Sequence, residues 1–128
     1  MRFFIFSSVV LAGQLAAGTM SDVAYAQTAD AGEQGYRTKC QVCHSVTADR
    51  KPGPIAPNLR GVIGRKAAST NFNGYSTALK NSKLTWDTKT MDAFLAGPSR
   101  LVPGTRMSVA VSNAQQRQAI VKYLARTK

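Results

Sequence analysis

The sequence predicts an all-α domain with three main helices, one short helix and long loops wrapped around a single large ligand. Apolar residues recur at helical spacing in several segments, and no segment alternates apolar and polar residues as a strand would. Residues 45–70 form a long irregular stretch with repeated Pro and Gly. A loop of this length fits a compact domain if it wraps around a ligand.

The first 26 residues are typical of a secretory signal. Arg2 gives a short positive region, Phe3–Ala12 is an apolar run, and Ala24-Tyr25-Ala26 matches an A-x-A cleavage pattern. The apolar run is short for a membrane-spanning helix, which favours a cleaved signal. An uncleaved membrane anchor is the alternative. Cleavage after Ala26 leaves residues 27–128 as one small domain.

The first helix of that domain is expected to run from near Asp30 to the cysteine pair. Asp30 and Glu33 have the spacing of a capping box. Gly32, Tyr36 and Cys40 then fall on one face, which predicts that this face is buried.

Two further helices are expected in the middle of the chain. The shorter one covers Tyr75–Lys80. The longer one, Thr88–Ala96, has Asp87 as its cap and is ended by Gly97-Pro98. An extended turn over Leu101–Met107 is expected to follow.

The last helix is expected from about Asn113 to Ala125. Ser112 and Gln115 have capping-box spacing at its start. One face of this helix carries Gln116, Ile120, Tyr123 and Leu124.

The domain is strongly basic. The signal contains one basic residue, Arg2, and one acidic residue, Asp22, so 16 basic and 5 acidic residues remain and the net charge stays +11. Such a charge favours an acidic partner, nucleic acid or an anionic surface. Because an exported protein is separated from the nucleic acid of the cell, we expect an acidic protein partner and no nucleic acid, and the domain itself to be a monomer.

The strongest signal in the chain is Cys40-Gln41-Val42-Cys43-His44. C-x-x-C-H is typical of a c-type haem attachment site. Two thiols three positions apart can reach the two vinyl groups of one haem as thioethers. The adjacent His44, the one histidine of the chain, is then placed to bind the iron from one face.

Three other interpretations of the motif have less support than a haem site. A structural disulfide would not need the adjacent histidine. A dithiol redox site would be expected in a strand–helix frame like that of thioredoxin, and the sequence shows no such frame. A structural zinc site would need a fourth protein ligand, and the chain has no further Cys or His.

A second axial ligand for the iron is expected from a methionine. Met91 lies in a helical segment beside Phe94 and Leu95, which is typical of an ordinary core residue. Met107 follows Pro103-Gly104-Thr105-Arg106, a loop that can bring a flexible thioether inward, so Met107 is the expected ligand. His/Met ligation raises the reduction potential and leaves no open position for oxygen chemistry.

The order of these residues resembles the mitochondrial and bacterial soluble cytochromes c of class I, and the resemblance covers the whole expected mature chain. Gly32 and Tyr36 precede the C-x-x-C-H as the glycine and aromatic of the family do. Ile120, Tyr123 and Leu124 match the C-terminal helix of the family, which crosses the first helix at the glycine. The resemblance therefore implies the cytochrome c fold around one covalent haem c.

The resemblance also implies roles for residues around the haem. Pro57-Asn58-Leu59 corresponds to the motif whose proline carbonyl accepts a hydrogen bond from the axial histidine. Gly64-Arg65 corresponds to the pair whose guanidinium lies near a haem propionate, and Tyr75 and Trp86 to the two aromatics that donate to the propionates. Val102–Met107 corresponds to the loop that carries the axial methionine.

The chain also departs from the family pattern. One extra residue lies within Thr47–Ala56, and Pro54 in that stretch is an alternative to Pro57. Leu79 stands where mitochondrial members tend to have an asparagine, and Phe94 where they have a tyrosine. The signal sequence separates the chain from the mitochondrial members and indicates the periplasm of a Gram-negative bacterium.

The expected function is therefore single-electron transfer and not catalysis. Acidic redox partners of a respiratory chain are expected, such as a quinol–cytochrome oxidoreductase, a terminal oxidase or a periplasmic dehydrogenase. A haem enzyme or gas sensor is the alternative if Met107 does not bind the iron, and a subunit of a larger complex is another. The basic residues expected around the exposed haem edge are Lys39, Lys66, Arg100 and Arg106.

Overall fold

The computed structural model describes residues 31–128. The expected signal sequence, its cleavage site after Ala26 and the expected start of the first helix at Asp30 lie outside the described residues. Among the described residues, none of the helices is long and apolar enough to cross a membrane.

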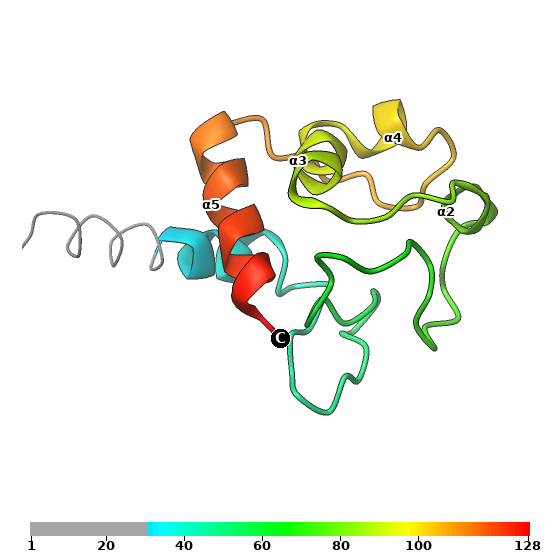
Figure 1. Ribbon diagram of the computed structural model, residues 1–128, viewed down its shortest axis with the longest axis horizontal. Helices are drawn as coiled ribbons and strands as arrows, with labels where there is room; N and C mark the ends of the chain where they lie inside the picture. Colours follow the sequence, from blue (N-terminus) through cyan, green and yellow to red (C-terminus); the bar gives the residue numbers. More distant parts are fainter. Residues whose placement is uncertain (1–30) are drawn as a thin grey trace, which may run out of the picture.

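Helices and irregular segments make up the described chain (Figure 1). Residues 31–39 are helical. They are followed by α2 (Thr77–Asn81), α3 (Thr88–Ala96), α4 (Pro98–Leu101) and α5 (Ala114–Arg126). Between residues 31 and 128 the backbone forms no strand beyond an isolated antiparallel bridge between Lys66 and Thr85. The expected all-α class is confirmed.

Helix starts follow the local capping chemistry. Asp87 caps α3 as expected, and its Oδ1 accepts a hydrogen bond from the Thr90 N–H at 2.6 Å. The short helix starts at Thr77 and not at Tyr75. Ser76 has an extended backbone and is the cap of this helix, because its hydroxyl accepts a hydrogen bond from the Leu79 N–H at 3.1 Å.

The cap of the last helix differs from the expectation. Asn113, and not Ser112, is the cap of α5, with its Oδ1 2.8 Å from the Gln116 N–H. The Ser112–Gln115 capping box is therefore wrong by one residue, because Asn113 has the extended backbone of a cap and an equally good acceptor. α5 also continues one residue past Ala125, to Arg126.

One short helix was not expected. α3 ends at Gly97 as predicted, but α4 begins directly at Pro98, inside the stretch read as a break. Proline is well suited to the first position of a helix, because the N–H that it lacks would have no partner there. The extended turn thus begins after α4, at Val102.

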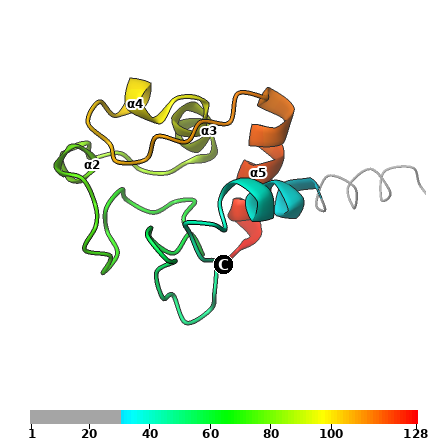
Figure 2. The ribbon, with the colours of Figure 1, turned by 180° about the vertical axis from the view of Figure 1, so that it is seen from behind.

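The 31–39 helix crosses α5 at two glycines, and the two views of the ribbon agree that these helices lie side by side (Figures 1 and 2). A Cβ at Gly32 would collide with the Ala119 carbonyl of α5. A Cβ at Gly35 would lie 2.8 Å from Ile120 Cγ1. Tyr36 and Tyr123 pack with ring centroids 5.4 Å apart. The expected buried face of the first helix is confirmed.

The remaining elements form a frame around the interior. The loop of residues 45–75 runs along one side, α3, α4 and the segment after them along the other, and α2 lies at the end away from α5 (Figures 1 and 2). Arg117 connects α5 to α3 and to the segment before α5. It pairs with Asp92 of α3 at 3.0 Å and donates to the carbonyls of Val111 and Ser112.

Candidate haem site

A cavity of about 510 Å³ lies inside this frame. Its lining is mainly apolar, and its size is typical of a site for a large small-molecule ligand. The 31–39 helix, the 45–75 loop, α2, α3, α5 and the segment after α4 all contribute to its wall. All the residues expected at the site lie on that wall: Cys40, Cys43, His44, Pro57, Arg65, Tyr75, Trp86 and Met107.

The cysteines lie where the first helix ends in a tight turn. The Cys40 N–H donates to the Tyr36 carbonyl at 2.8 Å, and the Cys43 N–H donates to the Cys40 carbonyl at 3.0 Å. The two thiols are not joined to each other. Burial, with a smaller contribution from Cys43, raises the pKa of the Cys40 thiol to about 11. A thiol that resists ionisation is poorly suited to dithiol exchange, so this interpretation of the pair loses support.

His44 is oriented by one hydrogen bond. Its Nδ1 lies 2.8 Å from the Pro57 carbonyl oxygen, which can only accept, so Nδ1 carries the proton. Burial lowers the pKa of His44, although the bond to Pro57 acts in the opposite direction. The lowered pKa favours the neutral imidazole, in which Nε2 has a free lone pair, the form that binds a metal. The acceptor is Pro57 and not the alternative, Pro54.

Asn58 holds the Pro57 carbonyl in place, and the sequence reasoning missed this role. It is 4% exposed, and its amide donates to the carbonyls of Thr47 and Lys51 at 3.1 and 2.9 Å. Its Oδ1 accepts from the Arg60 N–H at 2.7 Å. A buried polar residue directly after the expected proline was the available signal, but these partners come from a loop whose course the sequence does not predict.

Arg65 connects this loop to the cavity. Its Nη2 donates to the Asn58 carbonyl at 2.9 Å and its Nη1 to the Arg60 carbonyl at 3.2 Å. Burial is the largest cause of a lowered Arg65 pKa; nearby Tyr75 raises it and the charge of Arg50 lowers it further. The guanidinium thus remains a cation on a partly apolar wall, which suits a carboxylate ligand.

The two aromatic residues expected near the propionates lie on the same wall. The Tyr75 hydroxyl is 2.7 Å from the Thr70 hydroxyl. Trp86 is buried with its ring centroid 4.9 Å from that of Phe94. The backbone N–H of Trp86 donates to the Arg65 carbonyl at 2.9 Å, so Trp86 and Arg65 are fixed relative to each other.

Both candidate methionines contact the cavity. Met91 is buried on α3 in the core cluster with Phe94 and Leu95. Met107 is only partly buried and lies in the irregular segment after α4. Arg106, next to it, donates to the Gly74 carbonyl at 3.0 Å and ties this segment to the loop before α2.

The turn before Met107 requires a glycine. Gly104 has a φ of +88°, a conformation that residues with a Cβ rarely adopt. The Thr105 N–H donates to the Val102 carbonyl at 3.0 Å and closes the turn. This chain reversal brings residues 105–109 onto the cavity wall.

Of the basic residues expected around the haem edge, three reach the cavity. Lys39, Lys66 and Arg106 are on its wall. Arg100 is not on that wall, and its guanidinium donates to the Ala96 carbonyl at 2.9 Å, because α4 turns it back over the end of α3.

The residues present fit a haem better than a metal ion alone. A large apolar cavity has a cysteine pair and a metal-binding imidazole nitrogen on one wall, and a guanidinium and a tyrosine hydroxyl on another. Within residues 31–128, no group of three or more His, Cys, Asp or Glu side chains is arranged to hold a metal ion. The zinc interpretation therefore has no support from the described residues.

The chain is similar to known proteins over the same region. The sequence profile of the family described as cytochrome c matches residues 29–128. Cytochrome c2 of Rhodomicrobium vannielii is 43% identical over 95 residues, which is 73% of this chain and 74% of the relative. Cytochrome c2 of Rhodoblastus acidophilus is 39% identical over 100 residues, 77% of this chain and 92% of the relative.

A solved structure is similar as well. Cytochrome cH from Methylobacterium extorquens superposes with a TM-score of 0.66 and is 35% identical. The match covers 75% of this chain and 95% of the solved one.

Proposed function

Because the chain belongs to the cytochrome c family, we propose that it transfers electrons in the periplasm through a haem held between His44 and Met107. Proteins of this family carry one covalent haem c and transfer electrons instead of catalysing a reaction, and this chain is a monohaem electron carrier of that kind. When bound, the haem supplies one electron at a time as its iron changes between the ferrous and ferric states.

We assign the attachment to Cys40 and Cys43, as thioethers, and one axial position to His44. The single observation that carries the assignment of His44 is its hydrogen bond to Pro57 at 2.8 Å, because Nδ1–H is the donor and Nε2 is left for the iron. Asn58, the next residue, is itself held by hydrogen bonds to the Thr47 carbonyl and from the Arg60 N–H, and so keeps the Pro57 carbonyl in position.

We assign the second axial position to Met107. Support comes from its place on the cavity wall, and from the Gly104 turn and the Arg106–Gly74 bond that hold its segment there. Met91 is packed inside α3 among other core side chains and contributes to the wall as part of that core. Arg65, Tyr75 and Trp86 would hold the propionates.

The proposed location is the periplasm. The signal pattern ending at Ala26 supports export, and the family match begins at residue 29, shortly after the expected mature start at Gln27. The relatives compared above include bacterial cytochromes c2.

The proposed partners are acidic redox proteins, such as a quinol–cytochrome oxidoreductase, a terminal oxidase or a periplasmic dehydrogenase. Lys39, Lys66 and Arg106 surround the cavity and supply positive charge there. The acidic residues of the described chain have local partners: Glu33 bonds Arg37, Asp49 bonds Thr47 and Lys51, Asp87 caps α3 and Asp92 pairs with Arg117.

Substitution of the two methionines tests the ligand assignment. Met107→Ala is expected to leave the haem attached, lower the reduction potential and let cyanide bind the ferric iron, because it opens one axial position. Met91→Leu is the control, since it conserves volume in the core and should retain the weak long-wavelength band of ferric iron bound to sulfur. If Met91→Leu loses that band while Met107→Ala keeps it, the assignment is wrong.

A further inference from the structure

Arg50 has a backbone conformation that is rare for its residue type. It lies in the loop between His44 and Pro57, with a φ of 56° in the left-handed region that favours glycine. The turn is held by the Arg50 N–H, which donates to the Thr47 carbonyl at 3.1 Å. A non-glycine residue in this region points to a constraint on what its side chain does.

The side chain of Arg50 shares an acceptor with Arg65. Arg50 Nη1 donates to the Arg60 carbonyl at 3.0 Å, and the same oxygen accepts from Arg65 Nη1 at 3.2 Å. A Cβ placed on Gly61, whose φ is +64°, would lie 3.4 Å from Arg50 Nη1. Two guanidinium groups thus converge on one carbonyl, and the Arg50 guanidinium lies against Gly61.

No protein carboxylate compensates this pair of charges. Within residues 31–128, neither Arg50 nor Arg65 forms an ion pair, because the acidic side chains of that part of the chain are engaged elsewhere. The nearest acidic residue along the chain, Asp49, bonds Thr47 and Lys51. Arg50 is exposed to solvent, which weakens the repulsion between the two guanidinium groups, but its charge still lowers the pKa of Arg65.

We propose that Arg50 is an electrostatic positioning residue for the haem: with Arg65 it forms a two-cation corner that a propionate carboxylate neutralises. Arg65 lies on the cavity wall and Arg50 lies behind the shared Arg60 carbonyl. The inference rests on the proposed function, because the carboxylate is that of the bound haem. A positive charge at this corner favours the reduced state, so Arg50 raises the reduction potential.

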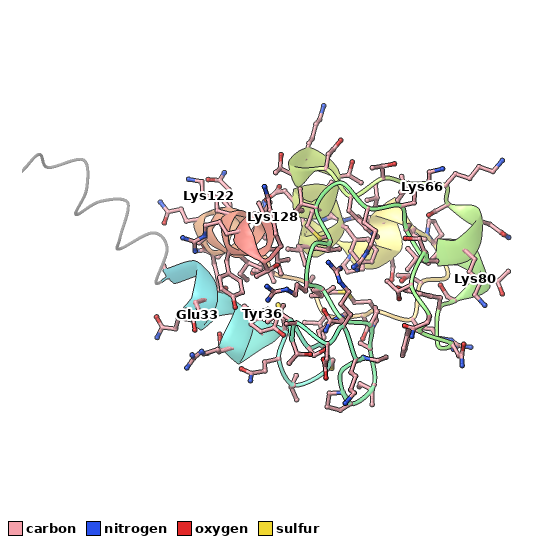
Figure 3. All side chains as sticks on the ribbon, turned by 60° about the horizontal axis from the view of Figure 1, so that its bottom comes forward. Glu33, Tyr36, Lys66, Lys80, Lys122 and Lys128 are labelled. Atoms are coloured by element: carbon pink, nitrogen blue, oxygen red, sulfur yellow. The ribbon has the colours of Figure 1, made fainter. Side chains whose placement is uncertain are left out.

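The test compares charge removal at two sites in the haem-loaded mature protein. Arg50→Asn removes the charge with a residue that tolerates the left-handed region, and Arg50→Lys keeps the charge. Lys122→Gln is the matched control, because Lys122 is an exposed residue of α5 and Figure 3 shows it at the opposite end of the molecule from Lys66 and Lys80. The readouts are the midpoint potential, titrated spectroscopically at low and high salt, and the denaturant midpoint.

Arg50→Asn is expected to lower the potential clearly more than Lys122→Gln, with a difference that shrinks as salt is added, and Arg50→Lys is expected to recover most of the loss. Arg50→Gly removes the same charge and suits the left-handed backbone at this position. It must therefore lower the midpoint potential by the same amount, even if Arg50→Asn matures poorly. Equal shifts for Arg50→Asn and Lys122→Gln, or no recovery in Arg50→Lys, would overturn the inference.

The outcome is separable from that of the proposed function. A chain that attaches no haem, or whose spectrum lacks the His/Met signature, contradicts the proposed function itself. A chain with that signature whose potential is indifferent to Arg50 contradicts only the role of Arg50.

Discussion

The orientation of His44 depends on hydrogen bonds in the loop that follows it. Its Nδ1 bonds the Pro57 carbonyl, and Asn58 fixes that carbonyl by bonding the backbone at Thr47, Lys51 and Arg60. The imidazole of His44 therefore has one orientation on the cavity wall, set by the loop that contains Pro57 and Asn58. The orientation of His44 is thus controlled in part by Asn58, the residue after the proline.

Replacing Asn58 tests this arrangement. Asn58→Ala is expected to lower the free energy of unfolding by about 1–3 kcal/mol, because it leaves buried polar groups of the loop without partners. Asn73→Ala is the control, an exposed asparagine in the neighbouring loop, and should change it by less than about 0.5 kcal/mol. Urea unfolding curves measure both, and equal effects would contradict the role given to Asn58.

At the scale of elements, the crossing of the 31–39 helix with α5 positions the cysteine pair. Gly32 and Gly35 let the two backbones approach. Cys40 directly follows the helix and lies on the cavity wall. Any side chain at Gly32 has to push the helices apart, because it would meet the rigid backbone of Ala119.

Gly32→Ala is therefore expected to cost about 1–3 kcal/mol of stability, as overpacking does in other cores, although alanine favours helix formation. Gln34→Ala in the same helix is exposed and should be neutral or slightly stabilising. Thermal or urea unfolding of the haem-loaded proteins gives the comparison. A Gly32→Ala protein as stable as Gln34→Ala would mean that the close crossing is not required.

The start of α5 gives a second test at this scale. Asn113→Ala is expected to destabilise the protein by about 1 kcal/mol, because it removes the acceptor for the Gln116 N–H. Ser112→Ala should have little effect, although its sequence position made it the expected cap. A larger loss in Ser112→Ala than in Asn113→Ala would restore the sequence-based assignment.

The sequence predicted local features well and long-range contacts poorly. The Asp87 cap and the apolar face of α3 depend on neighbours within one turn, so spacing was enough to predict them. Asn58 and Arg50 act through residues up to 11 positions away in an irregular loop, and no periodic pattern marks such contacts. Gly97-Pro98 is typical of a helix end, but Pro98 also starts α4. Whether proline ends or starts a helix depends on the turn before it, which the sequence does not predict.

At the scale of the whole molecule, positive charge covers several faces. The labelled lysines in Figure 3 lie at both ends of the molecule, with Lys122 and Lys128 near α5 and Lys66 and Lys80 at the other end. The net charge of +11 thus creates a broad positive field, and lysines and arginines add to it at the cavity wall.

Salt dependence follows from this field. The bimolecular rate of electron transfer to an acidic redox protein is expected to fall about tenfold or more between low and physiological ionic strength. Lys66→Gln should weaken the salt dependence more than Lys122→Gln, because only Lys66 lies on the cavity wall. Stopped-flow mixing with the partner measures both, and a rate that does not change with salt would contradict electrostatic docking.

The central claim is that this chain carries one electron at a time through a haem bound by His44 and Met107. A redox titration of the visible spectrum of the mature protein tests it most directly. We expect one covalent haem, a single one-electron transition, and a weak long-wavelength band in the ferric state that Met107→Ala abolishes. A ferric spectrum of an open, high-spin haem in the unmodified protein would contradict the claim.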